Sequence, residues 1–392
     1  MEVFILKSNG RDMDVKSYDV VVCGAGIAGV AAAVTAARQG MNTALIEKQC
    51  LLGGLATSGL IYIYLPLCDG YGTQVISGIA EEMIRSSVEY GPFDIPLLWG
   101  GPQNGNPGIG GKRFQCCFSP AGFTLTLDKM LEETGVDLWL DTMVIDAQTE
   151  ERNLRSVTVA NSSGQIRIDG KCFIDATGGA FVVQMAGGKV HRNENFVTPW
   201  FLEMSEEPDW FHFEGPLHVK CEGAISEQFK YPDCKTGKQV TGFVRKTWDM
   251  IRRRYDLLSP QKRKRNYPVH LPAMPQLRKI AHIDAVRIIN GDDHQRKFED
   301  SVGLVSDWRC PATPWDIPYR ALIPGDLNGI LAAGRCIGAA GEAWEVCRVI
   351  PVAAKTGEVA GFAASEAVKM EVPPTQIDYN KLKTLLKLEV NA

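Results

Sequence analysis

The chain has 392 residues, of which 45% are apolar and 22% are charged, with 42 Lys and Arg against 46 Asp and Glu. This composition is typical of a globular protein and excludes a disordered, collagen-like or coiled-coil chain. The net charge of −4 gives no general reason to expect nucleic acid or an anionic membrane as a partner. The length suits two or three domains, or one large core.

The eleven cysteines are scattered and form no CxxC pair, so the sequence predicts no metal site of the zinc or iron–sulfur type. A large chain without a disulfide-type cysteine pattern is typical of a reducing compartment, and we expect the cytoplasm. Residues 1–16 lack the apolar core of a secretory signal. Residues 20–37 are uncharged, but their glycines and alanines favour a buried strand and helix over a membrane span.

The first predicted elements form a β-α-β unit. The β-branched run 18–23 predicts a buried parallel strand, and the alanine-rich segment 27–39 predicts a helix that stops at Gly40. A second strand follows at 43–47. Since strand, helix and strand follow one another with short connections, the two strands are expected to be parallel neighbours in one sheet.

The turn between the first strand and the helix carries a GxGxxG motif. Gly24 permits the tight turn, Gly26 lets the backbone approach a pyrophosphate, and Gly29 lets the helix pack closely on the strand. The helix amino terminus offers free amides to phosphate. Glu47 lies 18 residues after Gly29 and can accept hydrogen bonds from a ribose hydroxyl, which argues against a 2′-phosphate. Together these features predict a dinucleotide site.

A second glycine pair follows the acidic residue. Gly53 and Gly54, with Ala56 and Thr57 behind them, can let the chain run beside an extended ligand with its amides facing phosphate or ring. A glycine-rich loop without a ligand is the alternative interpretation, and the motif by itself leaves it open.

Further elements are predicted from the middle of the chain. An amphipathic helix is expected at 74–90, a glycine-dense loop over the active site at 100–111, and a helix that Ser119 caps, with Pro120 in its first turn. An antiparallel meander is expected at about 136–172, from the alternating runs 136–141, 143–146, 154–159 and 165–169.

A basic stretch lies between residues 245 and 265. We interpret it as a solvated helix face, with attraction of an anionic substrate as the alternative. The six histidines show no spacing typical of a metal site.

Four blocks resemble the FAD-dependent oxidoreductases of the glutathione-reductase-like superfamily. They are 24–29 with 47–48, 53–54 with 56–57, the Ala-Thr-Gly motif within 173–178, and 330–338 followed by 348–351. More narrowly, the segments 317–320, 334–336 and 348–351 resemble a branch of largely uncharacterised bacterial FAD-dependent oxidoreductases.

The resemblance implies an α/β fold: a doubly wound, Rossmann-like FAD-binding domain with an inserted β-meander and a second, α+β substrate domain. The implied domains are 1–190 for the first part of the FAD-binding domain, 191–315 for the substrate or cap domain, and 316–392 for the second part of the FAD-binding domain.

The resemblance also implies FAD as the cofactor. The adenosine and diphosphate are expected on the first block and the isoalloxazine near the last, where a helix starting at Pro351 could direct its amides at the flavin. The expected cofactor-binding residues are Gly24, Gly26, Ile27, Ala28, Gly29, Glu47, Lys48, Gly53, Gly54, Ala56, Thr57, Val144, Ala176, Thr177, Gly178, Gly334, Arg335, Ile350 and Pro351.

The expected activity is hydride transfer between the flavin and a small organic substrate. No CxxxxC follows the first β-α-β unit and no second GxGxxG appears, so neither a redox disulfide nor a separate NAD(P)H domain is predicted. Arg348 is the first catalytic candidate, for the flavin or substrate side. Glu342 is a candidate for proton transfer and Arg320 for anion binding.

Two other functions remain alternatives at this point. One is a nucleotide-binding protein in which FAD or NAD is structural or sensory, and the other is an NAD-using enzyme similar to thiazole synthases. We expect a small-molecule substrate, no nucleic acid and no membrane as partners. The sequence leaves the oligomeric state open.

Overall fold

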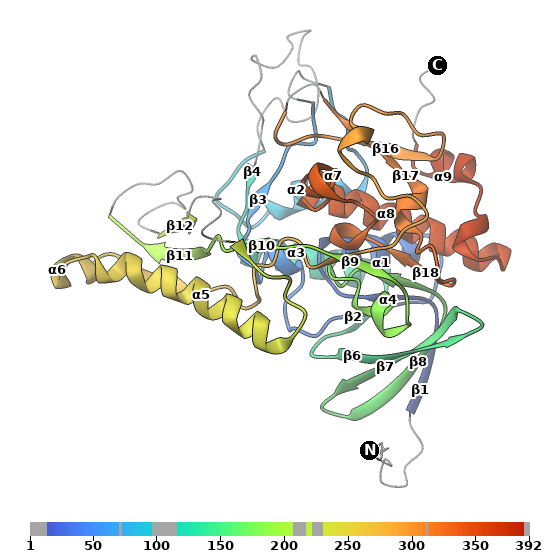
Figure 1. Cartoon of the computed structure of the whole chain (residues 1–392), viewed down its shortest axis with the longest axis horizontal. Helices are drawn as coiled ribbons and strands as arrows, with labels where there is room; N and C mark the ends of the chain where they lie inside the picture. The colour runs from blue at the N-terminus through green and yellow to red at the C-terminus, as the bar shows by residue number, and fades with distance from the viewer. Residues whose placement is uncertain are drawn as a thin grey trace.

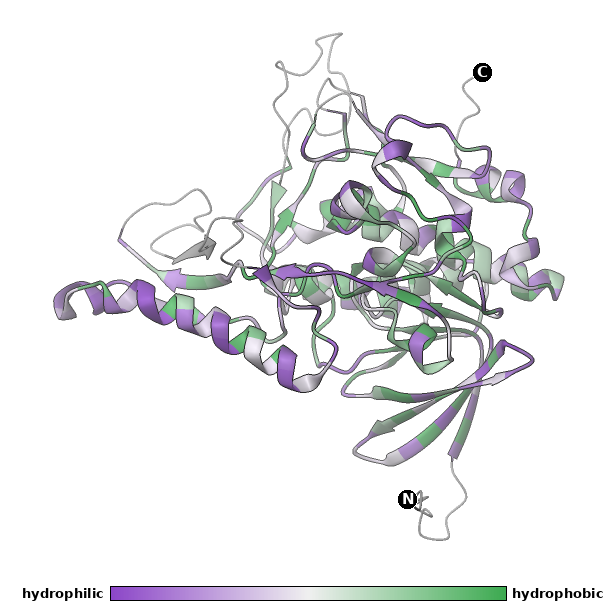
Figure 2. Ribbon diagram, viewed as in Figure 1, coloured by the Kyte–Doolittle hydropathy of each residue, from purple (hydrophilic) through white to green (hydrophobic). Residues whose placement is uncertain are grey.

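The computed structural model describes residues 14–69, 73–95, 116–206, 217–221, 230–310 and 313–387, with backbone alone for 217–221. The predicted loop at 100–111 lies outside these residues. A central sheet with helices packed against it forms the body of the molecule, and a long helix, α5, extends away from it (Figure 1). Apolar residues gather in the interior of this body, whereas α5 alternates between polar and apolar along its length (Figure 2).

The central sheet has seven strands. Its order is β5-β2-β1-β8-β7-β6, and β18 also pairs with β8. The strands are β1 (Asp14–Cys23), β2 (Thr43–Ile46), β5 (Asp137–Trp139), β6 (Met143–Glu150), β7 (Asn153–Asn161), β8 (Gly164–Asp175) and β18 (Ile330–Ala332).

Strand β8 joins the meander to the parallel sheet. Its first half pairs antiparallel with β7, its last three residues pair parallel with β18, and β1 runs parallel to it from Asp14 to Cys23. The doubly wound sheet with an inserted meander is therefore confirmed. The expected extent of the meander was wrong at its start, because β5 pairs parallel with β2, at Ala44 and Asp137, and belongs to the main sheet. It follows helix α3 (Pro120–Thr134), and a strand that returns through a helix lies parallel to its neighbour.

Helices α1 (Ile27–Arg38) and α8 (Ile350–Met370) pack against each other beside this sheet. A side chain at Gly357 would overlap the carbonyl oxygen of Ala28, and a Cβ at Gly361 would lie 2.6 Å from that of Ala32. The two helix backbones thus approach closely only because these positions are glycine. This contact joins the amino-terminal and carboxy-terminal parts of the chain.

Two helix boundaries test the sequence reasoning. Helix α3 begins as predicted, because the Ser119 hydroxyl accepts a hydrogen bond of 3.1 Å from the Gly122 amide. The helix predicted at 74–90 is shorter, since α2 spans Ile79–Ser87. Gly78 precedes it with φ of +73°, outside helical geometry, which places the helix start after this residue.

The segment between the two parts of the sheet forms small sheets and the helix α5 (Gly237–Asp256). The buried Glu203 carboxylate holds the end of α5, through Arg254 at 3.0 Å and the Tyr255 hydroxyl at 2.7 Å. The basic stretch 245–265 falls on α5 and on α6 (Pro260–Arg263). The strands of this segment are β9 (Val190–Arg192), β10 (Asn195–Phe196), β11 (Trp200–Met204), β12 (Leu217–Cys221), β13 (Lys230–Tyr231), β14 (Tyr267–His270) and β15 (Ala281–Ile283).

The remaining elements are short and come from several parts of the chain. A hairpin of β16 and β17 lies beside α9 (Figure 1). No helix in the part of the chain that the structure describes is long and apolar enough to cross a membrane. These elements are η1 (Gly54–Ala56), β3 (Ile63–Tyr64), β4 (Cys116–Cys117), α4 (Phe181–Met185), η3 (Gly291–Asp293), β16 (Ser301–Val305), β17 (Trp315–Pro318), η4 (Tyr319–Leu322), η5 (Gly334–Cys336), α7 (Gly341–Cys347), η6 (Pro374–Gln376) and α9 (Tyr379–Leu385).

Candidate active site

A cavity of about 370 Å³ lies where the amino-terminal β-α-β unit, the carboxy-terminal segment and the segment before β15 meet. Its lining combines glycine backbone, apolar side chains and a few charged groups, as expected of a cofactor site. Its lining residues are Gly24, Gly26, Ile27, Ala28, Ile46, Glu47, Lys48, Gln49, Gly53, Gly54, Leu55, Ala56, Thr142, Met143, Val144, Ala176, Thr177, Gly178, Phe181, Val182, Met185, Val240, Met274, Pro275, Leu277, Ile280, Ala333, Gly334, Arg335, Arg348, Ile350 and Ala353.

The glycines of the first turn differ in what surrounds them. Gly24 has φ of +98°, and a Cβ there would lie 2.7 Å from the carbonyl oxygen of Ala176. A Cβ at Gly29 would overlap the carbonyl oxygen of Gly24, whereas a Cβ at Gly26 would meet no atom within 4 Å. Gly24 and Gly29 therefore serve the fold of the turn, while Gly26 presents bare backbone to the cavity.

The amino terminus of α1 opens onto this cavity beside Gly26. Ile27 and Ala28, its first two residues, both line the cavity. The first intrahelical bond runs from the Val30 amide to the Gly26 carbonyl at 3.0 Å. The amides before Val30 have no intrahelical acceptor and carry the positive end of the helix dipole, so this wall favours an anion.

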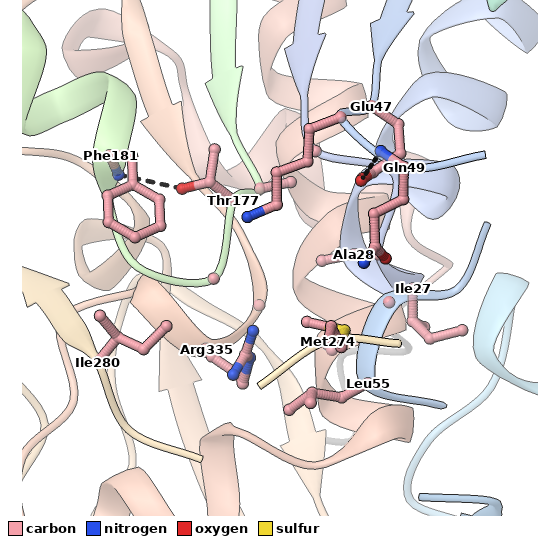
Figure 3. Close-up of a pocket in the computed structure, with 18 of the residues that line it drawn as sticks. Ile27, Ala28, Glu47, Gln49, Leu55, Thr177, Phe181, Met274, Ile280 and Arg335 are labelled. Atoms are coloured by element: carbon pink, nitrogen blue, oxygen red, sulfur yellow. Dashed lines mark hydrogen bonds between the residues drawn. The ribbon is translucent and has the colours of Figure 1, made fainter. Parts of the chain in front are cut away.

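Glu47 lies at the end of β2, with its buried carboxylate between two backbone amides. One oxygen accepts from Ala25 at 2.7 Å and the other from Gln49 at 2.9 Å, the second of which is drawn in Figure 3. Burial raises the pKa of Glu47, and these hydrogen bonds oppose the rise. Each carboxylate oxygen can accept a second hydrogen bond, so the residue that holds the turn also keeps acceptor capacity toward the cavity.

The second glycine pair lies directly beside the first turn. The Gly53 amide donates to the Ala25 carbonyl at 2.8 Å, and a Cβ at Gly54 would lie 3.2 Å from the Cα of Gly26. Gly53, Gly54 and Ala56 line the cavity. Thr57 does not, since its buried hydroxyl donates to the Leu52 carbonyl within the loop.

The Ala-Thr-Gly segment is held at the cavity by a buried acid. Asp175, the last residue of β8, accepts from the amides of Val182 at 2.9 Å and Val183 at 3.0 Å, and from the Thr177 hydroxyl at 2.6 Å. Burial raises the pKa of Asp175, although the hydrogen bonds oppose it. The Thr177 hydroxyl in turn accepts from the Phe181 amide, as Figure 3 shows.

Arg335 is a cation without an acidic partner in the cavity wall. Figure 3 shows its side chain between Ile280 and Met274. It donates to the Leu277 carbonyl, and no carboxylate among the residues that the structure describes forms an ion pair with it. Burial lowers the pKa of Arg335 to about 10, and the nearby charge of Arg348 adds to this effect. Such a site favours an anionic ligand, because an unpaired buried cation is costly.

Arg348 lies at the same end of the cavity, between α7 and α8. Its guanidinium donates twice to one carboxylate oxygen of Glu345, from Nε at 2.7 Å and from a terminal nitrogen. The other carboxylate oxygen of Glu345 is 2.6 Å from the ammonium of Lys279. Helix α8 begins at Ile350, which also lines the cavity. Its amino-terminal dipole adds to the positive character of this end.

The structure does not bring the other two catalytic candidates to the cavity. Arg320 is half exposed and forms a bidentate ion pair with Asp300, at 2.9 Å for both contacts. Glu342 is 70% exposed at the surface of α7 and lies 3.8 Å from Arg309. The sequence-based roles of Arg320 and Glu342 are therefore withdrawn, because neither side chain lines the cavity.

Of the nineteen predicted cofactor residues, all except Gly29, Thr57 and Pro351 line the cavity. Pro351 is buried in the first turn of α8. Sequence reasoning missed the wall formed by the segment before β15. The missed apolar residues of that wall and its surroundings are Leu55, Phe181, Met185, Val240, Met274, Pro275, Leu277 and Ile280.

The sequence and the fold are each similar to those of known proteins. The chain is 36% identical over 76 residues to the thioredoxin reductase of Ureaplasma parvum, a match that covers 19% of this chain and 25% of that protein. Its fold is similar to that of a geranylgeranyl bacteriochlorophyll reductase-like protein of Thermoplasma acidophilum, with a TM-score of 0.53, 16% identity, and coverage of 95% of this chain and 84% of that one.

A flavoprotein/dehydrogenase of Cytophaga hutchinsonii gives a TM-score of 0.49 at 15% identity, covering 94% of this chain and 82% of the other. The family model described as FAD dependent oxidoreductase matches residues 19–196 and 234–386. That match includes both glycine blocks, the Ala-Thr-Gly segment and the whole of α8. The chain therefore belongs to the FAD dependent oxidoreductase family.

Proposed function

We propose that the protein transfers a hydride between FAD and a small organic substrate that meets the flavin ring directly. The observation that carries this proposal is a cavity lined by the Gly26 turn together with Arg335, Arg348 and the start of α8. A dinucleotide fits it, because Gly26 presents open backbone and Arg335 has no acidic partner among the described residues.

The proposed placement follows the charges of the cavity. The amides at the start of α1 would bind the diphosphate, with Arg335 as its cationic partner on the facing wall. Glu47 would accept from a ribose hydroxyl, with Lys48 and Val144 beside the adenosine. Arg348 and the amino terminus of α8 would lie near the ring. Bound flavin supplies the hydride chemistry at its N5 atom, and the protein supplies orientation.

A flavin-coupled redox disulfide is not part of this proposal. None of the described residues that line the cavity is a cysteine. Cys116 and Cys117 are adjacent on β4 and both are free. Burial raises the pKa of the Cys117 thiol to about 12, which disfavours the reactive thiolate. The substrate is therefore expected to exchange electrons with the flavin itself.

We also propose that the chain falls within the glutathione-reductase-like superfamily. The GxGxxG turn, the three-stranded meander and the pairing of β18 with β8 support this assignment. A reducing compartment such as the cytoplasm is proposed for the protein, because nine of its cysteines are free thiols: Cys23, Cys50, Cys116, Cys117, Cys172, Cys234, Cys310, Cys336 and Cys347.

We propose a small-molecule substrate as the partner of this protein, and neither nucleic acid nor a membrane. The basic residues of α5 support this, since Arg252 and Arg253 each contact Asp249 and Arg254 contacts Glu203. Much of the positive charge of this helix is therefore already paired within the protein.

The test is the colour and redox behaviour of the purified protein. Denaturation should release FAD in a ratio near one per chain, and candidate donors should bleach the flavin without air. A yellow protein that no donor or acceptor can cycle would indicate a structural flavin. A colourless protein that retains NAD would contradict the proposal.

A further inference from the structure

The Arg348 end of the cavity contains one carboxylate that serves two cations. Glu345 contacts Lys279 at 2.6 Å through one oxygen and Arg348 through the other. Lys279 has 11% of its side chain exposed, Arg348 17% and Glu345 25%, so water screens these contacts only in part. We refer to these three residues as the Lys279–Glu345–Arg348 cluster.

The cluster joins two parts of the chain that both contribute residues to the cavity lining. Lys279 lies between Leu277 and Ile280, both of which line the cavity from the segment before β15. Its amide is fixed by Asn195, which accepts at 2.9 Å. Glu345 lies within α7, and Arg348 is the residue that follows this helix. Glu345 thus makes the charged contact between the segment before β15 and helix α7.

The charges of this end do not cancel. Lys279, Arg348 and Arg335 contribute three positive charges, and Glu345 is the one carboxylate that pairs with any of them among the residues described. A net positive environment favours the more negative of two forms of a bound group. A flavin becomes more negative when it is reduced, so its reduction potential responds to each charge in the cluster.

We propose that Glu345 is a positioning residue for the flavin end of the cavity: it holds the Arg348 guanidinium at the wall, ties that wall to the Lys279 segment, and offsets part of the positive charge that sets the flavin potential. This inference rests on the proposed function, because it takes the ring to lie near Arg348. Glu345 itself does not line the cavity and acts through Arg348.

The proposal predicts potential shifts of opposite sign. Glu345→Gln keeps the shape and removes the negative charge, so the flavin potential should rise. Lys279→Met removes a positive charge and should lower it, and Lys279→Arg should restore the wild-type value. Each shift is expected to correspond to about a tenfold change in the preference for reduced over oxidised flavin, which is about 30 mV for a two-electron couple.

The measurement is the midpoint potential of each holoprotein, by anaerobic titration against a reference dye. Glu82→Gln is the matched control, because Glu82 pairs with Arg38 on the surface, away from the cavity lining. Its potential should equal that of the wild type. Shifts of the same sign in Glu345→Gln and Lys279→Met would overturn the proposal, as would unchanged potentials with flavin bound.

The contact between Glu345 and Lys279 is tested in the protein without cofactor. Thermal unfolding of the apoprotein is compared for Glu345→Gln, Lys279→Met and the double variant, and the effects should be non-additive since the two side chains are in contact. Additive effects would contradict the proposed coupling of Glu345 to Lys279, even in a protein that binds no flavin. Absence of flavin from the wild type would instead contradict the proposed function, so the two failures are distinguishable.

Discussion

Replacement of Gly26 by valine separates folding of the first turn from binding at it. Gly26 has φ of −65° and ψ of 177°, a conformation that any residue adopts, and a Cβ there meets no atom within 4 Å. It caps α1, where replacing glycine by an apolar residue costs about 1 kcal/mol or less. For a protein of this size that cost lowers the unfolding temperature by about 2–4 °C or less.

The cost for the cofactor is much larger. The valine side chain would occupy the space in front of the α1 amides, which are expected to donate to the diphosphate. A hydrogen bond to a charged group contributes about 1.5–3 kcal/mol. Loss of two such bonds weakens binding by about 3–6 kcal/mol, which is about 100-fold or more. Gly26→Val should therefore purify nearly without flavin and still unfold cooperatively.

The assay combines flavin content after denaturation, FAD titration of the apoprotein by fluorescence, and thermal unfolding. Gly237→Val is the matched control, because a Cβ at Gly237 also meets no atom within 4 Å and this residue does not line the cavity. Gly24→Val should instead lose the fold, owing to its φ of +98° and the nearby Ala176 carbonyl. Affinity for FAD within threefold of the wild type in Gly26→Val would refute this reasoning.

Arg335→Met should raise the unfolding temperature of the apoprotein, since it removes a buried cation that pairs with no acid in the described part of the chain. It should also weaken FAD binding about 10- to 100-fold, and a destabilised apoprotein would argue against this reasoning. Arg320→Gln should leave flavin content and turnover unchanged and cost about 1–3 kcal/mol of stability, because it leaves the Asp300 carboxylate without its cation. Burial alone would raise the pKa of Asp300, but the hydrogen bonds and charge of Arg320 outweigh this effect and lower the pKa. The stability that this ion pair contributes is therefore present above about pH 4 and is lost as the pH falls through the folded-state pKa of Asp300. Unfolding temperatures of Arg320→Gln and wild type should therefore converge as the pH falls below 4, and a constant difference would disprove the coupling. Glu342→Ala should change turnover and stability by no more than the error of measurement, given its exposed ion pair; a large loss of turnover would restore its catalytic role.

Local patterns in the sequence were sufficient for the elements that bind the predicted dinucleotide. The strand, glycine turn and helix at 18–39 need only residues that are neighbours in the chain. The same holds for α3, whose cap Ser119 and first-turn Pro120 are adjacent, and for the start of α8 around Pro351. For this reason, most of the cavity-lining residues in the two glycine blocks were predicted from the sequence.

Interactions between distant segments were not readable in the same way. Arg320 forms an ion pair with Asp300, which lies 20 residues away in the sequence, and its side chain does not line the cavity. Strand β5 resembles the meander strands in its alternation, and only its pairing with β2 assigns it to the parallel sheet. The wall around Met274 and Pro275 carries no motif, because apolar contacts to a ligand need shape and not a fixed spacing.

The sequence by itself determined the class of fold and the glycine turn at the candidate cofactor site, since these depend on backbone geometry that glycine and proline impose locally. Only the tertiary structure decided which charges are paired. Among the residues described, no acid pairs with Arg335, whereas Glu345 contacts both Lys279 and Arg348. Electrostatic partners are selected by distance in space, and residues 279 and 345 become neighbours only when the segment before β15 packs against α7.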